Sequence, residues 1–355
     1  MKRIIVFLII VLSGTCLFAQ VHKNDSTKVD TLFKGGDDQR AEMLYNEGIK
    51  YFEAKKYTSA LDKFNASIVA KPSFEKAIYN RGVVKFELKD YSGAIADFDK
   101  SIQINPSAKA YFNRGKAKQE LGNRNGAMED FTHTIKLDAN HAQAYYYRGD
   151  LQFERDSFDL AIGDFTLAIQ IKSDYAYAYN DRGSARVMLG KFEDALADYK
   201  EAVRIDPSMA FAFNNLGSVK KKLKDYKGAV EDYTTAVKLK PDYYLAYSNR
   251  GTANYELGEY DKAIADYDQA IKLKSDYAYA YNNRGNAKFK KKAFDDALVD
   301  YNKAIELNPN YGYAFLNRGI NYEMLRKNAQ ACEDWKKASS LGINTGETYT
   351  KLQCK

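Results

Sequence analysis

The chain has few of the residues that catalysis and metal binding use. Its 355 residues include three histidines, three cysteines, one tryptophan and five prolines. The histidines, His22, His133 and His141, show no metal-ligand spacing. The sequence also has no Gly-rich phosphate loop and no Ser-centred nucleophile motif. We therefore expect no enzyme activity, no catalytic residue, no metal site and no cofactor.

The chain also has only a small excess of one charge sign. The formal charge is +7, from 54 basic against 47 acidic residues. Lys2 and Arg3 belong to a segment that we expect to be removed, and loss of their two charges leaves +5. Phosphate-binding proteins concentrate their basic residues on one face, whereas here the two signs are interleaved. The sequence predicts no nucleic-acid partner.

Only the amino terminus contains a long apolar run. A basic start is followed by the apolar residues 4–12 and by Ala19 at a cleavage site, which predicts a secretory signal peptide over 1–19. A bilayer span needs about 20 residues, so this run is too short to cross a membrane. The alternative is lipid attachment at Cys16, the only case in which we expect contact with a membrane. The predicted location is exported, periplasmic or extracellular, with outer-membrane association as a further alternative.

A polar linker separates this segment from the rest of the chain. Residues 20–40 have few core-forming side chains and include Gly35 and Gly36 near their end. We expect no packed structure there.

From residue 41 the chain repeats with a spacing of 34 residues, and of 33 once. In nine units, position 8 is glycine, position 20 is alanine and position 24 is aromatic, and all five prolines fall at position 32. The units begin at Ala41, Glu75, Ala108, Ala142, Ala176, Ala210, Tyr244, Ala278 and Gly312. The aromatic residues are Phe64, Phe98, Phe131, Phe165, Tyr199, Tyr233, Tyr267, Tyr301 and Trp335.

These positions predict a helix A, a turn and a helix B in each unit. Glycine at position 8 would face alanine at position 20, so that the two helices approach closely, and the aromatic residue would fill the gap beside them. Glycine at position 15, as in Gly122, Gly190 and Gly258, suits a helix C-cap. Proline at position 32 marks the end of helix B.

This pattern resembles the tetratricopeptide repeat, and with its signal peptide the chain resembles an exported bacterial member of that family. The resemblance covers 41–345 and implies an all-α superhelical solenoid of nine helix-turn-helix repeats, with helices A lining a concave face that binds proteins or peptides. Residues 346–355 fit a truncated helix A, with Tyr349 at position 4. They predict a C-terminal capping helix, because a solenoid must cover its open end.

Seven units carry arginine at position 7 together with aspartate at position 23, where the family often has leucine at position 7. We interpret these pairs as structural bridges within each repeat, because they are too regular for an active site. In the sixth unit Leu216 replaces the arginine, so the series is expected to lapse at Asp232.

Position 6 of helix A predicts a binding site for the backbone of a peptide. It is asparagine in seven units: Asn46, Asn80, Asn113, Asn215, Asn249, Asn283 and Asn317. A side-chain amide offers a donor and an acceptor, and so matches a peptide backbone without regard to sequence. The resemblance implies the same role, since superhelical members of the family use such an asparagine row. The alternative is that these amides bond neighbouring helices.

Position 2 adds candidate anchors in the fifth to ninth units. It is polar in the first four units and then becomes Tyr177, Phe211, Leu245, Tyr279 and Tyr313. Aromatic anchors beside polar groups are typical of recognition sites. Two groups of lysines add charge to this half, or alternatively form a solvated face: Lys220, Lys221, Lys222, Lys224, Lys288, Lys290, Lys291 and Lys292. Position 5 is Asn282 where a co-chaperone carboxylate clamp has lysine, which argues against that clamp.

The predicted function is a non-enzymatic scaffold that binds an extended segment of another protein or peptide in the concave groove. The alternative is a lipid-anchored component of the cell envelope, with an assembly or structural role, that acts through its outer face. The sequence names no partner and sets no oligomeric state.

Cys332 and Cys354 are predicted to form a disulfide. Helix B of the ninth unit and the capping helix should run antiparallel about Ile343, and each cysteine lies eleven residues from that point. Facing thiols pair in oxidising compartments, and export would place them in one. The alternative is that Cys332 serves only as a small apolar residue.

Overall fold

The protein is entirely helical over the part of the chain that the structure describes. The computed structural model describes residues 36–354, where it contains nineteen α-helices and no strand. The predicted signal peptide, and the predicted linker up to residue 35, lie outside the described residues. Residues 37–40 already belong to the first helix, because Asp37 and Asp38 suit the positive end of its dipole. The predicted linker was therefore too long at its C-terminal end.

The helices form nine A–B pairs and a final single helix, which confirms the predicted all-α solenoid. Helices A are α1 (Asp37–Glu53), α3 (Glu75–Glu87), α5 (Ala108–Glu120), α7 (Ala142–Glu154), α9 (Ala176–Met188), α11 (Ala210–Lys222), α13 (Tyr244–Glu256), α15 (Ala278–Lys290) and α17 (Gly312–Met324). Helices B are α2 (Tyr57–Ala70), α4 (Tyr91–Ile104), α6 (Arg124–Leu137), α8 (Phe158–Ile171), α10 (Phe192–Ile205), α12 (Tyr226–Leu239), α14 (Tyr260–Leu273), α16 (Phe294–Leu307) and α18 (Asn328–Ser340). The last helix is α19 (Asn344–Gln353).

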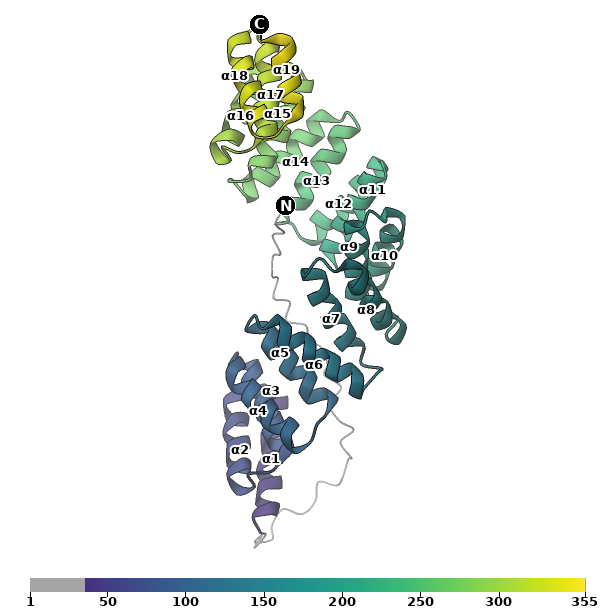
Figure 1. Ribbon diagram of the computed structural model, residues 1–355, viewed down its shortest axis with the longest axis vertical. Helices are drawn as coiled ribbons and strands as arrows, with labels where there is room; N and C mark the ends of the chain where they lie inside the picture. The colour runs from purple at the N-terminus through teal and green to yellow at the C-terminus, as the bar shows by residue number, and fades with distance from the viewer. Residues whose placement is uncertain (1–35, 355) are drawn as a thin grey trace.

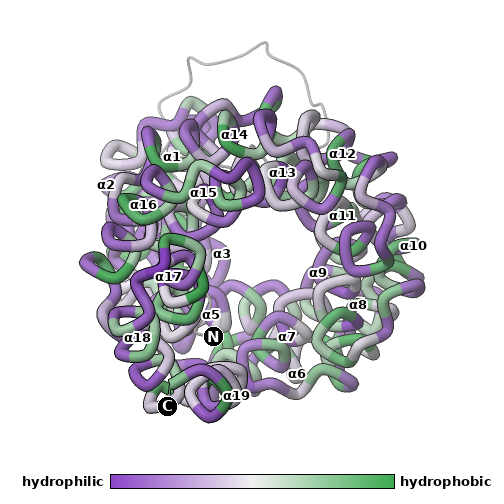
Figure 2. Tube along the Cα trace, turned by 90° about the horizontal axis from the view of Figure 1, so that it is seen from above, coloured by the Kyte–Doolittle hydropathy of each residue, from purple (hydrophilic) through white to green (hydrophobic). Residues whose placement is uncertain are grey.

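The pairs stack in chain order along one long axis (Figure 1). Viewed along that axis, helices A from α3 to α17 surround the centre, and helices B such as α10, α12 and α18 lie farther out (Figure 2). Helices A therefore form the inner side of the superhelix.

Among the described residues, no helix is both long enough and apolar enough to cross a membrane.

The turn between helices A and B has a left-handed residue at position 15 in every repeat. Three of these residues are the glycines predicted as C-caps, Gly122, Gly190 and Gly258, with φ of 76°, 74° and 79°. The other six carry side chains and have φ between 56° and 65°: Lys55, Lys89, Asp156, Lys224, Lys292 and Arg326. A side chain in this conformation costs about 1 kcal/mol, so the turn is imposed by helix packing and not by glycine alone.

Glycine at position 8 makes room for the aromatic ring at position 24 of its own repeat. A Cβ atom on Gly285 would lie 2.7 Å from Cε1 of Tyr301, and one on Gly48 would lie 2.6 Å from Cε1 of Phe64. The predicted close approach to the alanine at position 20 is also present, because a Cβ on Gly217, Gly251 or Gly319 would lie 3.1 to 3.2 Å from the carbonyl oxygen of that alanine. Positions 20 and 24 lie one helical turn apart, and the larger ring fills the space that both border.

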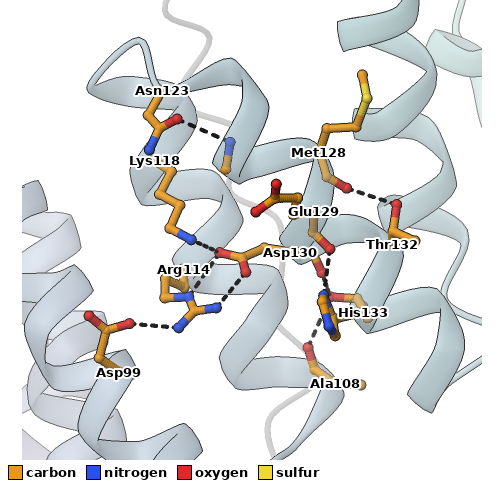
Figure 3. A network of polar contacts seen from close by, with 12 residues as sticks. Asp99, Ala108, Arg114, Lys118, Asn123, Met128, Glu129, Asp130, Thr132 and His133 are labelled. Atoms are coloured by element: carbon orange, nitrogen blue, oxygen red, sulfur yellow. Dashed lines mark hydrogen bonds and ion pairs between the residues drawn. The ribbon is translucent and has the colours of Figure 1, made fainter.

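The predicted arginine–aspartate bridges are present in all seven repeats that have the arginine. In the third repeat, Arg114 donates from Nε and Nη2 to Asp130 at 2.9 and 2.6 Å (Figure 3). Its Nη1 donates to Asp99 of the preceding repeat at 2.6 Å, and Lys118 Nζ lies 2.9 Å from Asp130. The bond to Asp130 raises the pKa of Arg114. The arginine therefore joins neighbouring repeats as well as the two helices of one hairpin.

The arginine–aspartate series lapses in the sixth repeat, as expected, but Asp232 still pairs with a lysine. Lys220 Nζ lies 2.7 Å from Asp232. Leu216 has no donor for the preceding repeat. That repeat has Lys200 at position 25, where the second repeat has Asp99, which accepts from Arg114 of the third repeat. Only the link that an arginine at position 7 would make from the sixth repeat to the fifth is absent.

The C-terminal helix covers the end of the solenoid, as the sequence predicted. Tyr349 stacks on Trp335 with ring centroids 4.8 Å apart, and Gly346 packs against the backbone of α18. The structure joins Cys332 to Cys354 by a disulfide, with Cα atoms 5.6 Å apart. The helix begins at Asn344, slightly before the expected residue 346.

Candidate peptide-binding face

Positions 2, 6, 9 and 13 of each helix A lie on one side of the helix, because their spacings of four, three and four residues bring them into line. Positions 3 and 10 lie on a neighbouring side of the helix and are buried, as Ala212 and Val219 show in α11. Helices B lie farther from the axis than helices A do (Figure 2). Positions 2, 6, 9 and 13 of helices A therefore face the centre of the superhelix. We call positions 2, 6, 9 and 13 of helices A the inner face.

The asparagines at position 6 bond the side chain at position 5 of the preceding repeat. Asn215 Nδ2 donates to Asn180 at 3.1 Å, and Asn249 Nδ2 donates to Asn214 at 2.9 Å. The corresponding bonds elsewhere are Asn80 to Tyr45 (3.2 Å), Asn113 to Tyr79 (2.6 Å) and Asn317 to Asn282 (2.9 Å). The structural alternative raised from the sequence is thus present: these amides connect neighbouring helices A.

The same amides retain capacity for a ligand. An asparagine side chain has two N–H groups and two acceptor lone pairs, and the inter-repeat bond uses one N–H. Asn46, in the first repeat, is exposed and has no preceding repeat to bond. Asn283 accepts from Asn282 at 3.1 Å within its own repeat. Binding of a peptide by this row remains a prediction.

The side chains at position 2 form an apolar row on the inner face from the fifth repeat onward. Tyr177 and Phe211 are half-buried and pack against one another with ring centroids 5.9 Å apart. Tyr279 and Tyr313 are 41% and 57% exposed, which is high for large aromatic side chains. This row supplies aromatic surface that the fold leaves open.

A third row on the inner face was missed in the sequence. In the fifth to eighth repeats, the tyrosine hydroxyl at position 24 reaches through to the polar side chain at position 9. These pairs are Tyr199–Ser184 (3.0 Å), Tyr233–Ser218 (3.1 Å), Tyr267–Thr252 (3.2 Å) and Tyr301–Asn286 (2.9 Å). The first four repeats have phenylalanine at position 24 and an apolar or charged residue at position 9. The joint change to tyrosine and to a hydroxyl or amide side chain could therefore have been recognised in the sequence.

The three rows coincide in the C-terminal half of the array. Position 2 of α9, α11, α13, α15 and α17 forms the apolar row, position 6 forms an amide row in the last four of these helices and is Asp181 in α9, and position 9 carries a hydroxyl or amide group in the first four. We call this surface the C-terminal inner face. Its combination of apolar anchors and groups that donate and accept hydrogen bonds suits an extended peptide.

The lysines of this half do not form one exposed charged group. Lys220 pairs with Asp232, Lys288 Nζ lies 2.8 Å from Asp300, and Lys291 pairs with Asp261. Two others, Lys221 and Lys222, line a cavity of about 280 Å³ between α9 and α11. We call it the repeat 5–6 cavity.

The two histidines within the described residues, His133 and His141, contact neighbouring groups of the fold. The ring of His133 stacks on Tyr111 at 4.9 Å. His141 caps α7, where its Nδ1 accepts from the backbone N–H of Ala144 at 3.2 Å, and burial lowers its pKa. Within residues 36–354, no group of three or more histidine, cysteine or acidic side chains could hold a metal ion.

These features define a helical repeat solenoid with an open, chemically mixed inner face. Three related sequence families match the chain. One, described as TPR repeat, matches residues 183–224, 219–258 and 251–292. Two are described as tetratricopeptide repeat, and they match residues 75–107 and 278–311 in one case and 112–176 in the other. The chain therefore belongs to the tetratricopeptide repeat family. This fold is typically a non-catalytic interaction scaffold.

Solved structures show the same fold. The chain resembles the C-terminal part of a TPR repeat-containing protein from Cytophaga hutchinsonii, with a TM-score of 0.55 and 19% identity over 67% of this chain and 98% of that one. A chain of the APC/C hetero-tetramer Cut9-Hcn1 has a TM-score of 0.56 and 14% identity, over 89% and 76%. YrrB, described as a TPR protein with an unusual peptide-binding site, has a TM-score of 0.47 and 24% identity, over 53% and 96%. A comparison with curated proteins gives no match.

Proposed function

We propose that this protein is a non-enzymatic scaffold that holds an extended peptide segment of another protein along its C-terminal inner face. The observation that carries the proposal is the row of apolar side chains at position 2, open to solvent at Tyr279 and Tyr313, beside the amide row at position 6. Aromatic side chains bury large areas when a partner covers them, and so provide most of the affinity in many interfaces.

The polar rows supply the complementary part of the recognition. An extended peptide presents N–H and C=O groups alternately, and amide or hydroxyl side chains can satisfy both. Because backbone groups are the same in every residue, these contacts orient the segment without selecting its sequence. Selectivity would then come from the side chains that reach the apolar row.

We also propose that the chain is exported to a periplasmic or extracellular site. The disulfide between Cys332 and Cys354 supports this location, because disulfides persist in oxidising compartments and are rare in reducing ones. The mass of the mature amino terminus tests it: cleavage after Ala19 fits a soluble exported protein, whereas lipid at Cys16 fits the anchored form.

Peptides selected from a displayed library of random extended sequences test the groove. Tyr279→Ala combined with Tyr313→Ala should weaken binding at least tenfold, the loss typical of aromatic anchors. The helical content should not change, because both side chains are largely exposed. Leu160→Ala, on the outer helix α8 at a position 63% exposed, is the control. Loss of binding in the control alone would place the site on the outer face.

A further inference from the structure

The junction between the fifth and sixth repeats departs from the pattern of the array in three positions. Leu216 replaces the bridging arginine, and Lys200 stands where that arginine finds an acceptor in other repeats. The third departure is Lys221 at position 12. Five repeats place an aromatic ring there and pack it against an aromatic ring at position 17, with centroids 5.3 to 5.7 Å apart.

Lys221 is thus the one cation at position 12 among the nine described repeats, where five have an aromatic ring and the other three have Gln119, Val187 and Glu323. Its side chain is half-buried and forms no ion pair or hydrogen bond with a described residue. Burial lowers the pKa of Lys221, and the neighbouring charge of Lys222 lowers it further, while Glu256 of α13 opposes them. A desolvated ammonium without a partner destabilises the free protein. Such local conflicts with the fold are expected at functional sites.

The cavity beside Lys221 has the shape and chemistry to receive a side chain. Its volume of about 280 Å³ lies just below the ~300 Å³ at which pockets for small molecules begin. Val187 and Met188 give it an apolar wall, and Ser184 and Ser218 add hydroxyl groups. Lys221 and Lys222 bring two positive charges to the same space. An aliphatic stem that ends in an anion complements this lining.

We propose that the repeat 5–6 cavity selects an acidic side chain, a glutamate in particular, on the peptide segment held by the C-terminal inner face. This inference rests on the proposed function, because Asn215 and Ser218 belong both to the cavity and to that face. The methylene groups of glutamate pack on Val187 and Met188, and its carboxylate meets Lys221 and Lys222. The bound carboxylate supplies the counter-charge that Lys221 lacks in the free protein.

Two amidated peptides test the inference, Ac-Ser-Leu-Glu-Leu-Ser-Leu-NH2 and its counterpart with Gln in place of Glu. The Glu peptide should bind about tenfold more tightly than the Gln peptide, because charge-assisted hydrogen bonds are roughly twice as strong as neutral ones. Added salt should reduce this ratio. Lys221→Met and Lys222→Met should each bring the ratio towards one, while Lys227→Met, at an exposed position on α12, should retain it.

Thermal unfolding of Lys221→Met separates a binding role from a structural one. Removal of a desolvated, unpaired ammonium should raise the unfolding temperature of the free protein while the preference for Glu is lost. A lower unfolding temperature together with an unchanged Glu preference would overturn the inference. NMR of ¹³C-dimethylated lysines gives a second measurement, since the pKa of Lys221 should rise when the Glu peptide binds.

The other outcomes are also decisive. Equal binding of the Glu and Gln peptides overturns the cavity inference and leaves the proposed groove intact. Tighter binding of a free-acid Gln peptide than of the amidated Glu peptide overturns the assignment to a side chain. Displacement of the Glu peptide by inorganic phosphate at equal concentration overturns the assignment to a peptide. If neither peptide binds, the inference fails, and the library selection decides the proposed function separately.

Discussion

Lys220 of α11 pairs with Asp232 of α12 at 2.7 Å. Both belong to the sixth repeat, which has Leu216 in place of the arginine at position 7. Asp300, two repeats later, has two cations, Arg284 at 2.6 Å and Lys288 at 2.8 Å. Both aspartates are buried. The two lysines hold the same position in their helices, but only Asp232 depends on its lysine alone.

This difference predicts unequal effects of the same substitution. Lys220→Met should lower the free energy of unfolding by about 3–5 kcal/mol, because it leaves a buried carboxylate without a cation. Lys288→Met should lower it by at most about 2 kcal/mol, since Arg284 still binds Asp300 through two bonds. Urea unfolding followed by circular dichroism measures both values. Equal losses would contradict the pairing described here.

Glycine at position 8 should be sensitive to a single added methyl group. Gly285→Ala should destabilise the protein by about 1–3 kcal/mol, because the new Cβ would meet the ring of Tyr301. Gly163→Ala in α8 is the matched control, since a Cβ there meets no atom within 4 Å. It should stabilise the protein by about 0.5–1 kcal/mol through its better helix propensity. A destabilising Gly163→Ala would show that helix propensity does not govern the exposed position.

The left-handed turn residues offer a stabilising change. Lys224 has a φ of 65°, a conformation that glycine adopts without strain. Lys224→Gly should therefore raise the free energy of unfolding by about 1 kcal/mol. Lys222→Gly, two residues earlier at the last residue of α11, should lower it slightly, because glycine is unfavourable in a helical conformation. Thermal unfolding of both variants checks the contrast, which a shared direction of change would contradict.

Stability should fall at alkaline pH because of buried tyrosines. Burial raises the pKa of Tyr243 and of Tyr277 to about 12. In the unfolded chain a tyrosine ionises near pH ~10. Their contribution to stability is therefore complete below about pH 10 and is lost as pH rises towards 12, because only the unfolded state releases these protons. Tyr277→Phe should reduce the fall between these pH values in a urea series. An unchanged slope would contradict the assignment.

The disulfide should stabilise the C-terminal end of the array. Cys332 and Cys354 are separated by 22 residues, a loop whose closure corresponds to about 3 kcal/mol in the chain-entropy model. Reduction should lower the stability of α19 first, seen as faster amide exchange around Tyr349. Intact mass after alkylation, with and without reductant, measures the bond. Two free thiols in the untreated, exported protein would rule it out.

Much of the fold could be predicted because each repeat has the same local pattern. The period of 34 residues located every hairpin, and the joint occurrence of arginine at position 7 and aspartate at position 23 predicted contacts between them. The contact between Gly285 and Tyr301 was missed, because spacing identifies which residues share a face but not which side chain fills the space between helices. The non-glycine turn residues were missed for a related reason: packing imposed a conformation that their side chains disfavour.

The candidate site was only partly predictable. The amide and apolar rows followed from helix periodicity, but their bonds across repeats did not, because these depend on how one helix A is placed against the next. The bond from Asn215 to Asn180 is an example. Bonds of this kind also affect how asparagine variants should be interpreted. Asn215→Ala and Asn249→Ala each remove an inter-repeat bond worth about 1 kcal/mol. Any loss of peptide binding in these variants must therefore be compared with their loss of stability.

Site-specific photo-crosslinking tests the central claim, that a partner peptide lies on the C-terminal inner face. A photoreactive phenylalanine analogue would replace Tyr313, on the inner helix α17, or Val299, 66% exposed on the outer helix α16. With a library-selected peptide bound, position 313 should form the cross-link and position 299 should not. Cross-links from position 299 without any from position 313 would contradict the account.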